Sequence, residues 1–498
     1  MNPPNPVTTN HDESLLASHG YEQELDRGLS LWSSFSVGFA TISPVVGIYS
    51  VMSLGAITVG PSWVWIVPLC LLLQLSVATV YAELSSQFPL AGGCYQWVRR
   101  LVGDRLAWFT GFLYLAAALA SLTTVAYLGG FWLGLLVMNE PPSPNTQVAC
   151  GALLLALGLG VNLLGINPLK YFVNAGIAAE AVASIGIGVL LLLFFRSHSL
   201  DMLFTSMGAE SASGGSYLSG FLAAMAVCGW AFLGFDACSQ LSEETTDARV
   251  STPRAILRSM IVVGLTVMLT AFAVTLSFKD AGGLVSGQIV DPVTPAVVDA
   301  FGNWAERPFV AIVLVAFVAC VVSVQTYIGR AIFGMARDGI LPGSALLRKV
   351  DRRKVPMAAM VFSTLVASLG LGLGLNATAV GTLIAFGSGG FFFVFLIVTV
   401  SALFARLTGR WNPDKGALRL GRKGLAINAF AVIWLTFEAI NVAWPRVLLA
   451  PPGAPWFQVW AVVLVFSALA LFGLAYLFIA KPHRRIATSL SFAGRAVG

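Results

Sequence analysis

Apolar residues fill twelve long stretches of the chain, and short polar connections separate these stretches. A helix needs about 20 mostly apolar residues to cross the hydrocarbon core of a bilayer. The pattern therefore predicts an all-α polytopic membrane protein with twelve transmembrane helices. The predicted spans are residues 31–56, 61–86, 105–138, 147–164, 171–195, 216–241, 256–278, 297–335, 357–375, 378–404, 424–445 and 457–480.

The composition excludes a water-soluble globular protein. Of the 498 residues, 57% are hydrophobic and only 10% are charged, and the mean hydropathy is +0.82. A soluble domain carries about 25% charged residues. Most of the six cysteines lie in or beside apolar runs, and none forms a CxxC pair, so we interpret them as buried apolar side chains.

Lysine and arginine are distributed unevenly over the connections. With a cytoplasmic N-terminus and twelve alternating spans, the cytoplasmic side collects 25 of the 29 basic residues. The other side receives only Arg196, Lys279, Arg307 and Arg446. This asymmetry is the one that orients membrane helices, so we expect a multi-pass protein of a bacterial inner membrane with both termini cytoplasmic. The net charge of +6 has the same origin, and no nucleic-acid partner is expected.

Two predicted spans contain helix breakers in their middle. The first carries Pro44 and Gly47, and the sixth carries Gly229 and Gly234 around an aromatic cluster. Proline and glycine are common in membrane helices and often produce only a kink. A pair of interrupted spans in corresponding halves of a chain is instead typical of a transporter, whose substrate site uses the freed backbone groups. We therefore predict that the first and sixth helices are discontinuous.

The two breaks suggest how the chain is organised, with two five-helix halves that correspond to each other and two further helices outside this core. The expected parts are an N-terminal tail (1–30), a ten-helix core (31–404, with repeats at about 31–195 and 216–404), a loop with two peripheral helices (405–480) and a C-terminal tail (481–498).

Acidic side chains inside the spans are few, and each costs at least about 2.5 kcal/mol at the bilayer centre. Asp236 follows the second break and could pair with an amine, take up a proton or cap the next helix. Glu180 could couple transport to protons or serve as a structural hydrogen-bond acceptor. We expect Glu83 to reach the interface or hold the next loop, and Glu438 to be peripheral.

No pattern points to an enzyme. All four histidines lie in tails or a loop, and no nucleophile–base pair, metal-spaced cluster or phosphate loop stands out. The segment Gly387–Gly390 is apolar in context and is interpreted as close helix packing. We therefore expect neither catalysis nor a cofactor or metal.

Three polar segments carry a family resemblance. They are Phe88–Trp97, Leu241–Arg249 with the following Pro253–Ile256, and Gly329–Pro342. In this order, and together with the span pattern, they resemble the amino acid–polyamine–organocation transporters over about residues 30–480. The Glu243–Glu244 pair is most similar to the amino acid/choline branch, which includes γ-aminobutyrate permeases.

The resemblance implies two inverted five-helix repeats plus two helices, alternating access, and a site between helices 1, 3, 6, 8 and 10. It also implies that Ser43, Val46 and Gly47 offer backbone groups to a substrate carboxylate. It places a gating aromatic at Trp230, with Phe235 and Asp236 beside it as further substrate-binding residues.

One departure bears on the substrate. Many relatives have a run of small residues at the first break, whereas this chain has Ser43-Pro-Val-Val-Gly47. The valines crowd the backbone and favour a substrate whose amine and carboxylate are far apart, or an amine alone. We thus expect a proton-coupled secondary transporter of small amino acids or amines of the γ-aminobutyrate kind, with Glu180 and Asp236 as proton-coupling residues.

Three alternatives remain open at this point. Ser323 and Thr326 could contribute to a sodium site, although such hydroxyls often bond to the preceding turn. The chain could also exchange substrates rather than couple to an ion. A non-transporting sensor of the same fold would bind the same ligands without flux.

Overall fold

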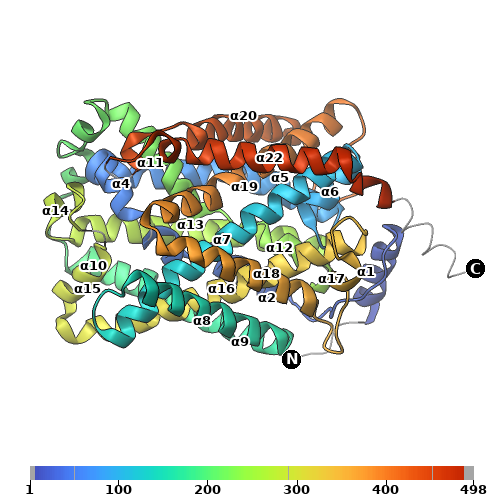
Figure 1. Cartoon of the computed structure of the whole chain (residues 1–498), viewed down its shortest axis with the longest axis horizontal. Helices are drawn as coiled ribbons and strands as arrows, with labels where there is room; N and C mark the ends of the chain where they lie inside the picture. Colours follow the sequence, from blue (N-terminus) through green and yellow to red (C-terminus); the bar gives the residue numbers. More distant parts are fainter. Residues whose placement is uncertain (1–5, 50, 290, 451–452, 487–498) are drawn as a thin grey trace, which may run out of the picture.

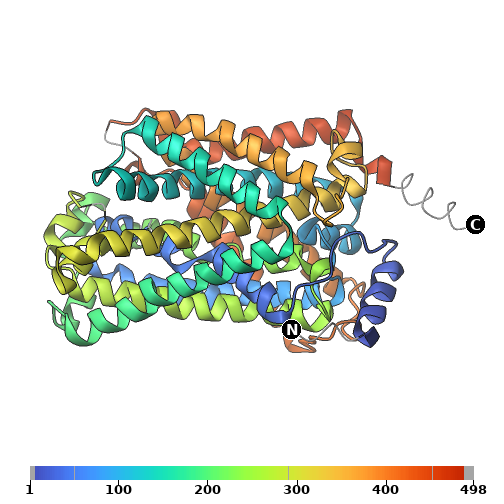
Figure 2. The same ribbon diagram turned by 90° about the horizontal axis from the view of Figure 1, so that it is seen from below.

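The computed structural model describes residues 6–49, 51–289, 291–450 and 453–486, and Figures 1 and 2 show them as a bundle of long helices lying side by side. Within these residues, twelve helical segments are long and apolar enough to cross a membrane. The prediction of an all-α polytopic membrane protein is confirmed. The spans are Leu31–Tyr49, Met52–Gln87, Asp104–Met138, Pro144–Leu163, Ile166–Phe194, Tyr217–Gln240, Ala248–Ser277, Asn303–Arg337, Met357–Leu375, Gly389–Leu407, Lys423–Ala443 and Ala461–Ile479.

Several spans are built from more than one helix. The helices within the spans are α2 (Leu31–Ile42), α3 (Pro44–Tyr49), α4 (Met52–Val59), α5 (Ile66–Gln87), α7 (Asp104–Met138), α8 (Pro144–Leu163), α9 (Ile166–Glu180), α10 (Ile187–Phe194), α11 (Tyr217–Cys228), α12 (Ala237–Gln240), α13 (Ala248–Ser277), α16 (Glu306–Arg337), α18 (Met357–Gly370), α19 (Ala377–Leu407), α20 (Lys423–Ala443) and α22 (Ala461–Ile479). The shorter helices in tails and connections are α1 (Pro6–Ser18), α6 (Gly93–Leu101), α14 (Ala281–Val285), α15 (Val293–Phe301), α17 (Ser344–Leu347) and α21 (Trp456–Val459).

Two predicted boundaries were wrong, because apolar residues continue across a turn. The first predicted span, 31–56, ends at Tyr49, and α4 belongs with the second span. The eighth, 297–335, is divided between α15 and α16 at Gly302, whose φ of +91° interrupts the helix. Hydropathy reports burial in lipid or protein, and it does not register a change of direction between two apolar helices.

The packing of the helices agrees with two related halves. If span n of the first half corresponds to span n+5 of the second, spans 2 and 7 correspond to each other, and so do spans 3 and 8. Both pairs are in contact, because α5 of span 2 packs against α13 of span 7, and α7 of span 3 packs against α16 of span 8. A contact between spans 3 and 10 should then have a counterpart between spans 8 and 5. Both contacts are present, because α7 packs against α19 and α16 packs against α9. An offset of five alternating spans reverses direction, so the corresponding helices run in opposite senses. This packing supports the predicted inverted repeat.

The two ends of the bundle differ in charge. The end on the right of Figure 1, where α1, α6 and α17 gather, carries the basic connections and is called the basic end below. The opposite end carries α4, α14 and α15. The last two spans differ as well, because α20 contacts α5, α11 and α19, whereas α22 is mostly exposed along its length.

Candidate functional site

The first span is interrupted at Ser43, one residue before the proline. Helix α2 ends at Ile42, Ser43 adopts a φ of 45°, and α3 begins at Pro44. Proline is well suited to the first turn of a helix, where its fixed φ fits and its missing N–H is not needed. The proline therefore starts the second half-helix, and the strained residue is the serine before it.

The sixth span is interrupted over a longer stretch. Helix α11 ends at Cys228, a 3-10 turn covers Gly229–Phe232, Leu233 is extended and Gly234 has a φ of +97°. This conformation favours glycine, because a Cβ atom at positive φ is strained. The predicted breaks in the first and sixth helices are therefore present, and both predicted glycines lie within the break of the sixth.

The two breaks lie directly against each other. A Cβ atom built on Gly47 would lie 3.1 Å from Cα of Ala231, in the other break. A Cβ atom on Gly234 would lie 2.7 Å from Cγ2 of Thr41 at the end of α2. Glycine at these two positions permits the backbones of the interrupted segments to approach closely, so a change in one break must be transmitted to the other.

Glu180 caps the break in the first span. Its carboxylate accepts hydrogen bonds from the Ser43 hydroxyl and from the backbone N–H of Val45, at 3.0 Å in the second case. The next two amides are also engaged, since the N–H of Val46 donates to Ser43 Oγ and that of Gly47 to the Ser43 carbonyl. The amides of Val46 and Gly47, predicted to hold a substrate carboxylate, thus have partners within the break, and the neighbouring amide of Val45 is bound by the carboxylate of Glu180.

Glu180 stands at an irregularity of its own helix. It ends α9, and a π-helical segment over Ala181–Gly186 follows before α10. Such π-segments are rare and occur often at functional sites. Hydropathy could not predict this irregularity, because the run is apolar and free of proline.

Asp236 is buried below the sixth-span break and is 1% exposed. Its Oδ2 accepts a hydrogen bond of 2.6 Å from the hydroxyl of Tyr114 on α7. Asp236 stands at the N-cap position of α12, as one interpretation had it, but its side chain makes no cap hydrogen bond there. The carboxylate instead joins the sixth span to the third.

A small cavity of about 20 Å³ lies beside the breaks. This volume holds about one water molecule, so the cavity is too small for an amino acid. The walls come from the first, third, sixth, eighth and tenth spans, the five spans that the family resemblance implied. The lining residues are Thr41, Ile42, Val46, Ser121, Val125, Trp230, Leu233, Gly234, Val324, Tyr327 and Phe391.

Aromatic rings connect the cavity to Asp236. Tyr114 lies edge-on to the lining residue Phe391, with ring centroids 5.7 Å apart, and 6.3 Å from the ring of Tyr327. Trp230 completes this wall. A cation in the cavity would face several π-systems, and each such contact is worth about 0.5–2 kcal/mol. The Tyr114 hydroxyl, which donates to Asp236, therefore links this wall to the carboxylate.

The predicted substrate residues are distributed over three places. Val46 and Trp230 line the cavity. Ser43 and Gly47 belong to the capped break beside it, and Phe235 packs away from it against Tyr81 and Phe395. The remaining wall residues, Ser121, Tyr327 and Phe391 among them, and Tyr114 behind the wall have no local motif. Only the implied participation of helices 3, 8 and 10 pointed to them.

The basic end is closed by buried ion pairs between the segments that carried the family resemblance. Arg330 on α16 makes a bidentate pair with Glu244 at 2.7 and 2.9 Å, and Arg337 pairs likewise with Glu243. Glu243 also accepts from the backbone N–H of Ala91, in the segment before α6. The three motifs therefore meet in space and join the ends of the second, sixth and eighth spans.

The N-terminal tail is part of this closed end. The Tyr21 hydroxyl donates to Asp338 at 2.9 Å, and the guanidinium of Arg337 lies 3.8 Å from the centre of the Tyr21 ring. Asp12 pairs with Arg27 at 3.2 Å and accepts from the amide of Asp247, directly before α13. The expected N-terminal tail is therefore docked over the basic end, with α1 as a helix that hydropathy did not predict.

Docking of this tail is expected to weaken in acid. Burial, with a smaller contribution from Arg100, lowers the pKa of His19 from 6.5 to about 4. A released tail would restore the ordinary pKa and bind more protons, so the docked state loses stability as the pH falls from about 6.5 towards 4. The protection of the amides of residues 12–29 against hydrogen exchange, corrected for the intrinsic pH dependence of exchange, should fall over that range, and His19→Gln should remove this pH-dependent loss of protection. An equal loss in the variant would assign the effect to another group.

Glu83 holds the loop between the tenth and eleventh spans. It forms a buried ion pair with Arg406 at the end of α19 and accepts a hydrogen bond of 3.1 Å from the backbone N–H of Leu420. The acid therefore holds a loop, but a loop distant in the chain rather than the next one, which was the loop expected.

Two abutting helix breaks with buried acids and a closed central cavity, inside a bundle of twelve spans, define a membrane transport protein. The chain belongs to the amino acid permease family, whose model matches residues 29–468. It is an amino acid/choline transporter-like member of the amino acid–polyamine–organocation superfamily, as the resemblance predicted.

Individual relatives match over most of their length. An amino-acid permease BAT1 homolog of Oryza sativa subsp. japonica is 26% identical, with 86% of this chain and 87% of the relative covered. A choline transporter of Saccharomyces cerevisiae is 24% identical over 89% of this chain and 80% of the relative. Amino-acid permease 2 of Neurospora crassa is 24% identical over 96% and 90%.

Proposed function

We propose that this permease is a secondary active transporter of a small amine, or of an amino acid whose ammonium lies far from its carboxylate, as in γ-aminobutyrate. The observation that carries the proposal is the charge arrangement at the two breaks. Glu180 already binds the amide of Val45 at the first break, and Asp236 lies behind the aromatic wall. Both fixed groups are acids that become anionic when they release their proton, so the site is then complementary to a cation.

The distribution of charge argues against a tightly held α-carboxylate. An incoming carboxylate at the first break would have to displace Glu180 or lie beside it, and like charges at close range repel. An ammonium group meets no such obstacle at Trp230, Tyr327 and Asp236. The relatives' names, amino-acid permease and choline transporter, span ligands that share a cationic nitrogen.

The closed geometry supports the proposal of alternating access. The central cavity is too small for any of these substrates, and the basic end is held by the Arg330–Glu244 and Arg337–Glu243 pairs. Substrate must therefore enter and leave through states in which the helices have moved. The contact between Gly47 and Ala231 supports a joint movement of both breaks.

We propose proton coupling rather than sodium coupling because of the hydrogen bonds that the hydroxyl groups of α16 already make. Thr326 is already engaged by Asn162 and by the Val322 carbonyl, at 2.6 and 2.7 Å. Ser323 alone has an unpartnered hydroxyl among the described residues of this proposed sodium site. The carboxyls of Glu180 and Asp236 are buried and can each carry a proton.

Replacing Glu180 by glutamine is expected to flatten the pH dependence of uptake. Glutamine keeps the size and one acceptor oxygen, but it has no titratable proton and places an NH2 group where one of the two carboxylate oxygens accepts from Ser43 or Val45. The maximal rate should fall by about tenfold, the effect of losing one charge-assisted hydrogen bond of about 1.5 kcal/mol. Uptake measured over a pH series checks this, and a wild-type pH profile would remove Glu180 from proton coupling.

Uptake into proteoliposomes tests the proposed function. Labelled γ-aminobutyrate, choline, putrescine and the common amino acids are offered with and without an imposed proton gradient, and then with a sodium gradient. Gradient-driven accumulation of at least one amine supports the proposal. Counterflow without accumulation would identify an exchanger. A ligand that stabilises the protein in thermal unfolding without any flux would identify a sensor.

We further propose that the basic end faces the cytoplasm, with both tails on that side, because the basic residues gather there. Accessibility of single cysteines introduced at Glu140 and Lys415 to an impermeant reagent tests this orientation. The relatives named above come from a plant and two fungi, so they lend no support to a bacterial inner membrane. The membrane in which the chain resides stays a prediction.

A further inference from the structure

Glu438 on α20 was expected to be peripheral because it lies in the eleventh span. The structure shows that it is not. The side chain is 0% exposed and lies among α5, α11 and α19. One oxygen, Oε2, accepts a hydrogen bond of 3.1 Å from Asn441. The other, Oε1, is buried without a hydrogen-bond partner among the described residues. Buried polar atoms without partners are rare in proteins, so this one calls for an explanation.

The unpartnered oxygen faces the break in the sixth span. A Cβ atom built on Gly229 would lie 3.4 Å from Oε1 of Glu438 and 2.9 Å from Cζ of Phe392. Gly229 is the residue at which α11 gives way to the 3-10 turn. A charge on Glu438 would therefore act directly on the point where the sixth span changes conformation.

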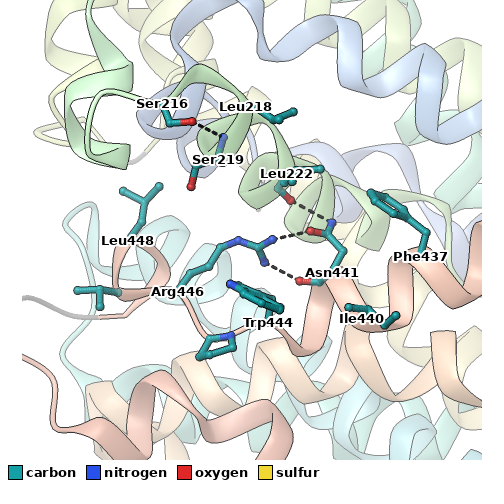
Figure 3. A pocket seen from close by; sticks show the side chains of 12 residues that line it. Ser216, Leu218, Ser219, Leu222, Phe437, Ile440, Asn441, Trp444, Arg446 and Leu448 are labelled. Carbon is teal, nitrogen blue, oxygen red and sulfur yellow. Dashed lines mark hydrogen bonds between the residues drawn. The ribbon is translucent and has the colours of Figure 1, made fainter.

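A pocket leads from the opposite end of the bundle towards this carboxyl group. It has a volume of about 690 Å³ and lies between α11 and the end of α20 (Figure 3). Asn441 lines it, and Arg446 donates to the carbonyl and to Oδ1 of Asn441, both at 2.5 Å. The same asparagine donates to Glu438 and to the Leu222 carbonyl, so Asn441 separates the pocket from the buried carboxyl.

Few ionisable groups surround Glu438. The thiols of Cys70 on α5 and Cys228 on α11 lie within its electrostatic reach, as does the guanidinium of Arg446. The only charged residue of α19 is Arg406, which pairs with Glu83 at the other end, and α22 carries no carboxylate, amine or guanidinium. A carboxylate with one hydrogen bond and no ion pair is poorly stabilised in such surroundings.

We propose that Glu438 is a proton-binding site, reached from this pocket past Asn441, whose protonation follows the conformation of the sixth span. In the closed state the carboxyl group carries the proton. When α11 moves and water enters past Asn441, the O–H bond breaks, the proton passes to water in the pocket, and the carboxylate is left facing Arg446. Reprotonation from the same pocket permits the break to close. This proposal depends on the proposed transport function in one respect only, the movement of the sixth span.

Difference infrared spectroscopy on the full-length protein in proteoliposomes tests this directly, through the C=O stretch of protonated carboxyl groups. Choline and γ-aminobutyrate are the added probes, and the external pH is changed separately. We compare the wild type with Glu438→Gln, which keeps an acceptor for Asn441 but has no titratable carboxyl proton. Glu438→Asp keeps a carboxyl group, and Glu140→Gln removes an exposed glutamate at the same end as a matched control.

The wild type, Glu438→Asp and Glu140→Gln should show a carboxyl band that changes with substrate or with external pH, and Glu438→Gln should lack it. The pH response of uptake, up to about tenfold per pH unit for one proton, should shrink in Glu438→Gln while substrate affinity stays the same. An unchanged band and pH response in Glu438→Gln would overturn the proposal. A band that titrates in a protein without any flux would support this site and contradict the transport function instead.

Discussion

Uptake by the Asp236→Asn variant is expected to fall by about two orders of magnitude. The substitution removes the anion behind the aromatic wall and leaves a bound ammonium without its counter-charge. Loss of one partner in a buried charge pair costs about 2–5 kcal/mol, and each 1.4 kcal/mol is a factor of ten. The measurement is the initial rate of substrate uptake, normalised to the amount of protein in the vesicles.

The Tyr114→Phe variant is the matched control for this effect. It deletes the hydroxyl that donates to Asp236 at 2.6 Å and keeps both the ring and the carboxylate. Uptake should fall by about tenfold, less than for Asp236→Asn, because only the orientation of the carboxylate is lost. Both variants should unfold at temperatures near that of the wild type. Wild-type uptake in Asp236→Asn would exclude this residue from the site.

The second large effect concerns stability. Replacing Glu244 by glutamine leaves the guanidinium of Arg330 buried without its bidentate partner, in a pair whose side chains are 2% and 3% exposed. Breaking one side of a buried ion pair costs about 3–5 kcal/mol. Thermal unfolding of the detergent-solubilised protein should therefore begin at a clearly lower temperature, and the yield of folded protein should drop.

An exposed pair in the same protein provides the comparison. Lys279 and Asp299 lie 3.5 Å apart with side chains 63% and 41% exposed. Such pairs contribute about 0–1 kcal/mol, so Lys279→Met should leave the unfolding temperature almost unchanged. A double variant with Glu244→Met and Arg330→Met should recover most of the stability lost in Glu244→Gln, because no buried charge remains. If Glu244→Gln unfolds like Lys279→Met, the pair does not hold the basic end together.

The sequence was sufficient for the number of spans and for the spans that are interrupted, since both depend on local composition. It misplaced the first break, because Pro44 is read as a helix breaker although here it begins α3 after the strained Ser43. It also joined α15 to α16, because apolar residues continue past Gly302.

The partners of the buried acids could not be predicted from the chain. Glu180 reaches Ser43 over 137 positions, and Asp236 receives its hydrogen bond from Tyr114, 122 positions away. These contacts depend on how spans 1, 3, 5 and 6 cross, and neither hydropathy nor helical spacing contains that information. The same is true of Glu438. It lies in the eleventh span, outside the ten-helix core, and yet the fold places its carboxyl group against Gly229.

Competition for uptake tests the central claim, that the site between the two breaks recognises a cationic nitrogen through Asp236 and the aromatic wall. Uptake of the labelled substrate is challenged with an amine and with an isostere in which carbon replaces the charged nitrogen, for example choline against 3,3-dimethylbutanol. The amine should compete at least about a hundredfold more strongly in the wild type, and Asp236→Asn should erase most of that difference. Equal competition by both compounds in the wild type would contradict the account.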